Sequence, residues 1–136
     1  MVFLIYGPPG AGKTTYTKKY MSPGDVLVDF DLIYQALTAA PVHERTNILF
    51  DRVEDCRKYL INTIDRYPEV RNTWVVMCAP KREDREPFRK TGATLKLIKE
   101  SAPVCIGRCR ERGENWERWE KAIKKWFEDY EPEVAV

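Results

Sequence analysis

Apolar runs alternate with helix-like segments along the whole chain. Four runs rich in β-branched and aromatic residues predict buried strands, at 2–6, 26–30, 73–80 and 93–99. The segments between and after them carry helical spacing or helix start and stop signals, at about 12–21, 31–40, 43–67, 81–92, 103–113 and 114–130. Strands separated by helices imply right-handed crossovers and a parallel sheet. We therefore expect an α/β three-layer sandwich with a parallel sheet of four to five strands.

The chain shows no internal repeat and no linker-like change of composition. This predicts one domain over 1–130, followed by a tail, 131–136, that frays. The last helix carries an aromatic stripe that includes Trp116, Trp119 and Trp126. Helical spacing favours packing of this stripe on the sheet or on a second subunit over stacking on bases. A homo-oligomer therefore stays an open alternative.

Charge is nearly balanced, with 23 basic and 21 acidic residues among 136 and a net charge of +2. Such a chain is not a general polyanion binder, so any nucleic-acid contact must come from a local patch. No apolar run reaches the ~18 residues of a membrane span. The N-terminal apolar run is too short for a signal peptide, and the four cysteines form no CxxC pair. These features predict a cytoplasmic protein without a membrane partner.

The segment "GPPGAGKT" directly follows the first predicted strand and opens the first predicted helix. It matches the P-loop pattern G-x-x-x-x-G-K-[ST]. Glycines allow backbone N–H groups to turn inward around an anion, and the helix N-terminus adds its positive dipole end. Lys13 is expected to neutralise phosphate charge and Thr14 to ligate Mg²⁺. The predicted cofactor is ATP with Mg²⁺, held by Gly7, Pro8, Pro9, Gly10, Ala11, Gly12, Lys13, Thr14 and Thr15.

Two acidic residues, Asp29 and Asp31, stand where the second strand meets the next helix. The carboxyl ends of parallel strands face the ligand crevice. Phosphoryl transfer to an alcohol needs a carboxylate that accepts the hydroxyl proton. Asp31 is a candidate for that general base, and Asp29 for a group that orients Mg²⁺ or Asp31. The spacing alone gives equal weight to an alternative without a catalytic role, in which Asp31 caps the helix and Asp29 is a solvated strand end.

Arg108 and Arg112 in "GRCRERG" are four residues apart and share one helical face. Arginines at this place can stabilise charge on a transferring phosphoryl group. The alternative is a solvated face whose arginines pair with Glu111 or Glu114.

These motifs occur in the order GxxxxGKT, D-x-D, R-x-x-x-R-G. In this order the chain resembles the phage-type polynucleotide 5′-kinases and the small phage-encoded P-loop ATP-binding proteins related to them, over about residues 2–128. The resemblance implies a P-loop NTPase fold of the kinase type and, for a phage-encoded protein, the host cytoplasm. It implies that Asp31 is the general base and that Arg108 and Arg112 are lid arginines, with Arg112 as the phosphate clamp.

The sequence departs from this family at two places. Tyr34 stands where the family has an arginine that contacts substrate phosphate, and Cys78 and Ala79 replace an aspartate after the third strand. A nearby basic cluster can take over phosphate binding or form a solvated loop, and it consists of Lys81, Arg82 and Arg85.

We therefore expect Mg·ATP-dependent phosphoryl transfer to a hydroxyl, with a nucleic-acid 5′-hydroxyl as acceptor. A kinase for a nucleoside, nucleotide or other small molecule uses the same parts and remains an alternative. A P-loop ATPase or ATP-binding partner in a phage DNA-processing assembly is the third possibility. A motor needs a strand that ends in Asp-Glu, and neither "VVMCAP" nor "VLVDF" supplies it.

Overall fold

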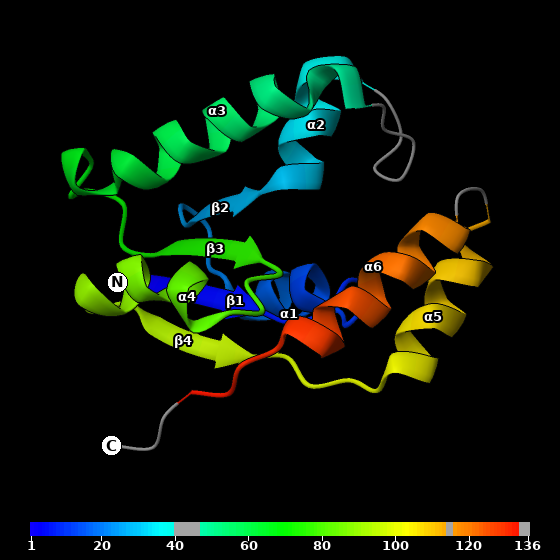
Figure 1. The fold of residues 1–136 in the computed structure, drawn as a ribbon. Coiled ribbons are helices and arrows are strands. Elements are labelled where there is room, and N and C mark those ends of the chain that lie inside the picture. Colours follow the sequence, from blue (N-terminus) through cyan, green and yellow to red (C-terminus); the bar gives the residue numbers. More distant parts are fainter. Residues whose placement is uncertain (40–46, 114–115, 134–136) are drawn as a thin grey trace.

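The fold is a four-stranded parallel sheet with helices on both faces (Figure 1), in a computed structural model that describes residues 1–39, 47–113 and 116–133. The strands are β1 (Val2–Tyr6), β2 (Val26–Asp29), β3 (Thr73–Met77) and β4 (Thr94–Leu97), in the order β2-β3-β1-β4. The sheet confirms the predicted α/β architecture. β1 lies in the interior of the sheet, since it pairs with β3 on one side and with β4 on the other.

Alternation along the strands builds a separate core on each face of the sheet. Leu4, Val28 and Val75 face one side, where side chains from α2 (Phe30–Thr38), α3 (Phe50–Asn62) and α4 (Arg82–Lys90) cover them. Ile5 and Val76 face the other side, which α1 (Lys13–Tyr20) covers. A third cluster joins α5 (Ala102–Glu111) and α6 (Trp116–Asp129) to Ala11 of the glycine-rich segment. The result is three layers, with α5 and α6 packed beside the carboxyl end of the sheet.

Element boundaries differ from the prediction where a local cap or turn decides them. The second helix begins at Phe30, because the Asp29 carboxylate accepts from the backbone N–H of Asp31 at 2.9 Å. Asp29 is therefore the N-cap, and the idea that Asp31 caps this helix is wrong. The helix predicted at 43–67 is shorter: α3 follows a 3₁₀ turn at Asn47–Leu49 and precedes another at Ile64–Arg66. Positions 40, 43–46, 114, 115 and 134–136 of the predicted elements lie outside the described residues.

The segment after α6 is anchored as far as residue 133. Arg85 is completely buried, and its guanidinium donates to the backbone oxygens of Ala79, Pro80 and Glu131. Its Nε also lies 2.7 Å from a carboxylate oxygen of Glu133. Fraying from residue 131 is thus not observed. Because these contacts occupy Arg85 inside the protein, it cannot hold substrate phosphate.

The aromatic stripe of α6 is used within the chain. Trp126 is buried, stacks on Tyr130 with ring centroids 4.8 Å apart, and donates from Nε1 to the Cys78 carbonyl at 2.7 Å. Ile123 is fully buried in the cluster with α5. Trp126 thus packs on the protein's own core, as predicted, and ties α6 to the end of β3, whereas Trp119 of the same stripe lines the cavity described below. Within the described residues, no helix is long and apolar enough to cross a membrane.

Candidate functional site

The glycine loop, residues 7–14, connects β1 to α1 and includes the start of that helix, and its close contacts and left-handed backbone require glycine. A Cβ on Gly7 would lie 2.7 Å from the carbonyl oxygen of Ile98, so any side chain there would push the chain after β4 away. Gly12 has φ +91° and precedes the first residue of α1. This left-handed turn allows the helix to start directly at Lys13. The N-terminus of α1 therefore opens at the concave side of the loop, an arrangement suited to an anion.

Lys13 places its ammonium over this loop. Its Nζ donates to the carbonyl oxygens of Gly7 at 3.0 Å and Pro8 at 2.8 Å, and lies 3.8 Å from the Cys78 thiol. Loop carbonyls therefore hold the ammonium where a bound anion would meet it. Lys13 lines the cavity described below.

Thr14 and Asp29 form an oxygen pair between the loop and the end of β2. The Thr14 hydroxyl donates to one carboxylate oxygen of Asp29 at 2.5 Å, while the other oxygen accepts from the Asp31 N–H. Asp29 is only 6 % exposed. Hydroxyl and carboxylate oxygens are the ligands that Mg²⁺ prefers, and Mg²⁺ often takes one or two protein oxygens besides phosphate and water. The pair predicted to bind the metal thus fits that ion, and it also holds the first turn of α2 against the loop.

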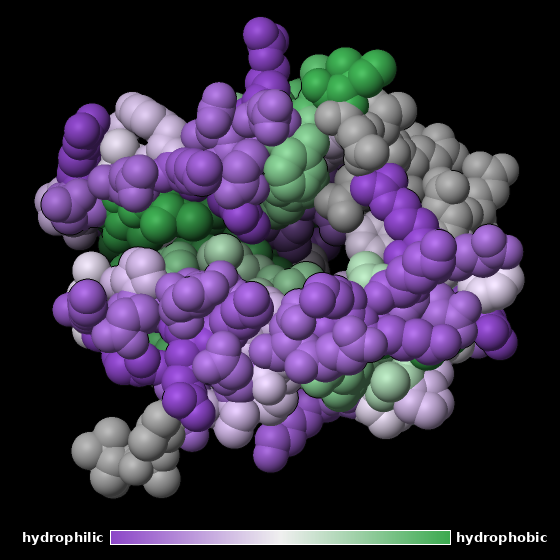
Figure 2. Space-filling model, in the orientation of Figure 1, coloured by the Kyte–Doolittle hydropathy of each residue, from purple (hydrophilic) through white to green (hydrophobic). Residues whose placement is uncertain are grey.

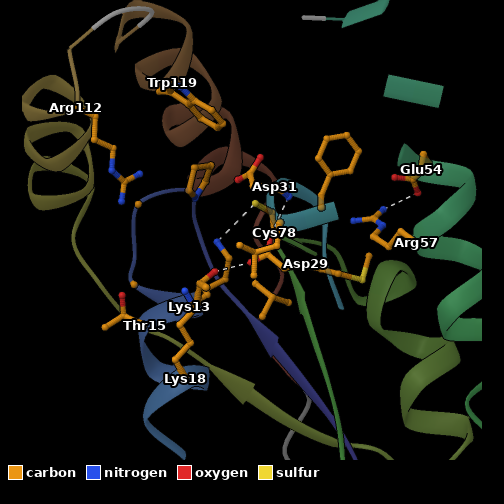
Figure 3. A pocket seen from close by; sticks show the side chains of 18 of the residues that line it. Lys13, Thr15, Lys18, Asp29, Asp31, Glu54, Arg57, Cys78, Arg112 and Trp119 are labelled. Atoms are coloured by element: carbon orange, nitrogen blue, oxygen red, sulfur yellow. Dashed lines mark hydrogen bonds and ion pairs between the residues drawn. The ribbon is translucent and has the colours of Figure 1, made fainter. Parts of the chain in front are cut away.

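A cavity of about 450 Å³ brings these residues together with Asp31 (Figure 3). Asp31 lines it from the first turn of α2. Helices α5 and α6 contribute one wall and α3 the opposite one, and the molecule is visibly hollowed between them (Figure 2). The predicted residues that line the cavity are Pro9, Gly10, Gly12, Lys13, Thr14, Thr15, Asp29, Asp31 and Arg112.

The structure separates the two arginines of α5. Arg112 caps the end of the helix, is exposed and lines the cavity. Arg108 is not among the lining residues: it donates to the Gly10 carbonyl at 2.9 Å and lies 3.4 Å from Glu100. Arg108 therefore braces the glycine loop, whereas Arg112 is placed to meet a ligand.

Two buried thiols support the loop. Cys105 and Cys109 pack beneath Gly10, and burial raises the pKa of both thiols. Because the thiolate is the reactive form, these cysteines act as small apolar side chains. All four cysteines are free, and only Cys78 is exposed.

Sequence reasoning missed the wall that α3 contributes. Phe50, Glu54 and Arg57 line the cavity together with Phe30 of α2. The spacing of Phe50, Glu54 and Arg57, four and three residues, puts them on one face of the helix. That spacing is the signal that could have found them, but nothing in it shows that α3 faces the glycine loop.

Comparison with known proteins supports the fold. No protein-family model matches the chain, and no curated protein sequence matches it. Among solved structures, the chain is similar to one chain of the "Pnkp1/Rnl/Hen1 RNA repair complex", with a TM-score of 0.62 and 14 % sequence identity. The likeness covers 96 % of this chain and 46 % of the other, so this chain spans about half of that protein's length. At this identity the likeness shows a common fold.

Proposed function

We propose that this protein is a P-loop phosphotransferase that moves the γ-phosphoryl group of Mg·ATP to a hydroxyl, with a nucleic-acid 5′-hydroxyl as acceptor. One observation carries the proposal. The glycine loop with Lys13, the Thr14–Asp29 oxygen pair and the Asp31 carboxylate line a single cavity. An anion site, a place for Mg²⁺ and a carboxylate for proton transfer are the parts that phosphoryl transfer requires.

Each residue has a role that follows from its place. The glycine loop and the N-terminus of α1 bind phosphate oxygens through backbone N–H groups. Lys13 exchanges its loop carbonyls for phosphate oxygens and neutralises their charge. Thr14 and Asp29 supply oxygens to Mg²⁺, which would draw charge from the transferring group. Asp31 orients the acceptor hydroxyl and takes its proton. Arg112, at the end of α5, pairs with phosphate oxygens from the opposite wall.

Two arguments favour a nucleic-acid acceptor. The motif order resembles polynucleotide 5′-kinases, and the similar solved structure belongs to a complex whose name includes RNA repair. A kinase for a small molecule is the second candidate, because a cavity of about 450 Å³ has the volume of an ordinary small-ligand site. The two differ in whether the acceptor extends out of the cavity.

The test is label transfer from γ-labelled ATP to 5′-hydroxyl DNA, 5′-hydroxyl RNA, nucleosides and nucleoside monophosphates. Asp31→Asn should cut transfer by about 100-fold with ATP affinity retained, the usual scale for loss of a general base. Lys13→Ala should abolish Mg·ATP binding itself. Asp55→Asn, an exposed acid elsewhere on α3, is the matched control. Label on an oligonucleotide end supports the proposal, and label on small acceptors alone supports the second candidate. Phosphate release without label transfer to any acceptor would refute both.

A further inference from the structure

The α3 wall of the cavity, made of Phe50, Glu54 and Arg57 with Phe30 of α2 beside them, combines two aromatic rings with an ion pair. Phe30 and Phe50 lie with ring centroids 5.2 Å apart and their planes inclined by 39°. Phe50 is 49 % exposed and lines the cavity, so its ring is accessible to a ligand. The face of an aromatic ring can stack on a nucleobase whatever hydrogen-bonding groups the edge of that base carries.

Arg57 and Glu54 stand beside these rings. The Arg57 Nη2 lies 2.6 Å from a Glu54 carboxylate oxygen, and both side chains are more than four-fifths buried. The guanidinium carbon is 6.0 Å from the centre of the Phe30 ring. The Arg57 Nε is buried and has no acceptor among the residues the structure describes. The ion pair therefore offers both N–H donors and carboxylate acceptors at the edge of an aromatic surface.

The net charge of the Glu54–Arg57 pair decides which kind of ligand group this wall can bind. Glu54 offsets the charge of Arg57, so this wall attracts a phosphate far less than an uncompensated arginine would. A neutral group with its own donors and acceptors on a flat ring fits the pair better. Carboxylates accept from base amino groups, and arginine donates to base nitrogens and carbonyl oxygens.

The position of this wall decides whether it holds the base of the acceptor or the adenine of the donor. Phe30 lies directly between Asp29 and Asp31 in the chain, so this wall starts at the carboxylate that takes the acceptor proton. The glycine loop, to which the proposed function assigns the donor phosphates, lies on the other side of Asp31 in Figure 3. A molecule whose hydroxyl reaches Asp31 from the α3 side brings its own base over Phe30 and Phe50.

We infer that Phe30, Phe50, Glu54 and Arg57 form a subsite for the 5′-terminal nucleobase of the acceptor, with the two rings as its stacking surface and the ion pair reading its edge. The inference rests on the proposed function only for the identity of the acceptor. It adds that the terminal base contributes to binding, which a kinase that holds only sugar and phosphate does not require.

The test measures binding and does not depend on catalysis. The probes are two 5′-hydroxyl hexanucleotides: one carries 2-aminopurine at its 5′ end, and the other carries an abasic residue there. Wild type should bind the 2-aminopurine probe about 10-fold more tightly, about 1.4 kcal/mol, which lies in the range for one base stacked on an aromatic ring. Stacking should also quench the 2-aminopurine fluorescence.

Phe50→Leu removes the outer ring but keeps an apolar side chain at a half-exposed position, so the fold should survive. It should reduce the preference to about 2-fold and remove most of the quenching, with Mg·ATP affinity unchanged. Phe127→Leu, at a 40 % exposed phenylalanine on α6 away from the cavity, should behave as wild type. Glu54→Gln, which alters the edge contacts, should change the order of preference among different 5′-terminal bases.

Several results would overturn the subsite. Equal affinity of wild type for the two probes is one. A loss of ATP affinity in Phe50→Leu without a change in probe binding would mean that the rings hold the adenine of the donor. Equal weakening of both probes by Arg57→Gln would mean that Arg57 binds phosphate. If the preference and its loss in Phe50→Leu are found but no label is transferred, the subsite stands and the phosphotransferase proposal fails.

Discussion

Asp29 carries two separable tasks, and substitution can distinguish them. One carboxylate oxygen caps α2 through the Asp31 N–H, and the other accepts from Thr14 at 2.5 Å. Asp29→Asn keeps an acceptor for the cap, since asparagine is as good an N-cap as aspartate, but it removes the negative charge that Mg²⁺ needs. Asp29→Ala removes both tasks.

The two variants should therefore differ in stability. Loss of an N-cap costs about 1 kcal/mol, and loss of a hydrogen bond to a charged group about 1.5–3 kcal/mol. Asp29→Ala should lower the free energy of unfolding by about 2.5–4 kcal/mol, the sum of these two losses. For a chain of this size each kcal/mol corresponds to about 4 °C in Tm, so its Tm should fall by about 10–16 °C. Asp29→Asn should lose about 1 kcal/mol or less.

Affinity for nucleotide should behave differently. Wild type should bind ATP more tightly with Mg²⁺ than with EDTA, and both variants should lose most of this difference. Urea unfolding gives the stabilities, and ATP titrations with and without Mg²⁺ give the affinities. The reasoning is refuted if Asp29→Asn keeps the full effect of Mg²⁺, or if Asp29→Ala is as stable as Asp29→Asn.

Two further predictions concern stability. Arg85→Met should lower the free energy of unfolding by about 2–4 kcal/mol, since it removes the buried hydrogen bond to the Ala79 carbonyl and one of the two arginines that pair with Glu133. Arg89→Met, at the exposed arginine of that pair, should cost less than about 1 kcal/mol. Equal costs of the two variants in urea unfolding would contradict the stabilising role of buried Arg85. The pKa of Asp25 is lowered, first by the backbone N–H of Ser22 and then by the Trp74 indole. Its folded pKa is thus below its unfolded pKa, so its stabilising contribution is complete above the unfolded value of about 4 and is lost as pH falls through the folded value. Asp25→Asn should accordingly be less stable than wild type at pH 7, and the gap should close below about pH 4; a gap that stays constant from pH 7 to pH 2.5 would show that Asp25 is not involved.

Local patterns in the sequence determine much of this protein. Short apolar runs rich in β-branched and aromatic residues predict the strands, and helical spacing predicts the helices between them, because both signals depend on local chain geometry. The glycine loop is also local, since its turn, its Lys13 and its Thr14 lie within eight consecutive residues. Asp29 and Asp31 could be identified as a pair at a strand end, although their spacing did not show which one caps α2.

Contacts between distant segments were decided only by the tertiary structure. In the strand order β2-β3-β1-β4, β3 separates β2 from β1, the strand that leads into the glycine loop. The end of β2 nevertheless reaches the loop, where Asp29 accepts from Thr14, and one face of α3 lines the same cavity. No period within α3 reveals that Arg57 faces a ligand site, because a polar helical face looks the same whether it meets solvent or a cavity. Arg85 is similar: its charge suggested a phosphate contact, yet two of the residues that bind it inside the protein, Glu131 and Glu133, come only after the last helix. Sequence patterns specify each element because local forces form it, whereas the site depends on which elements meet, and that follows from packing of the whole core.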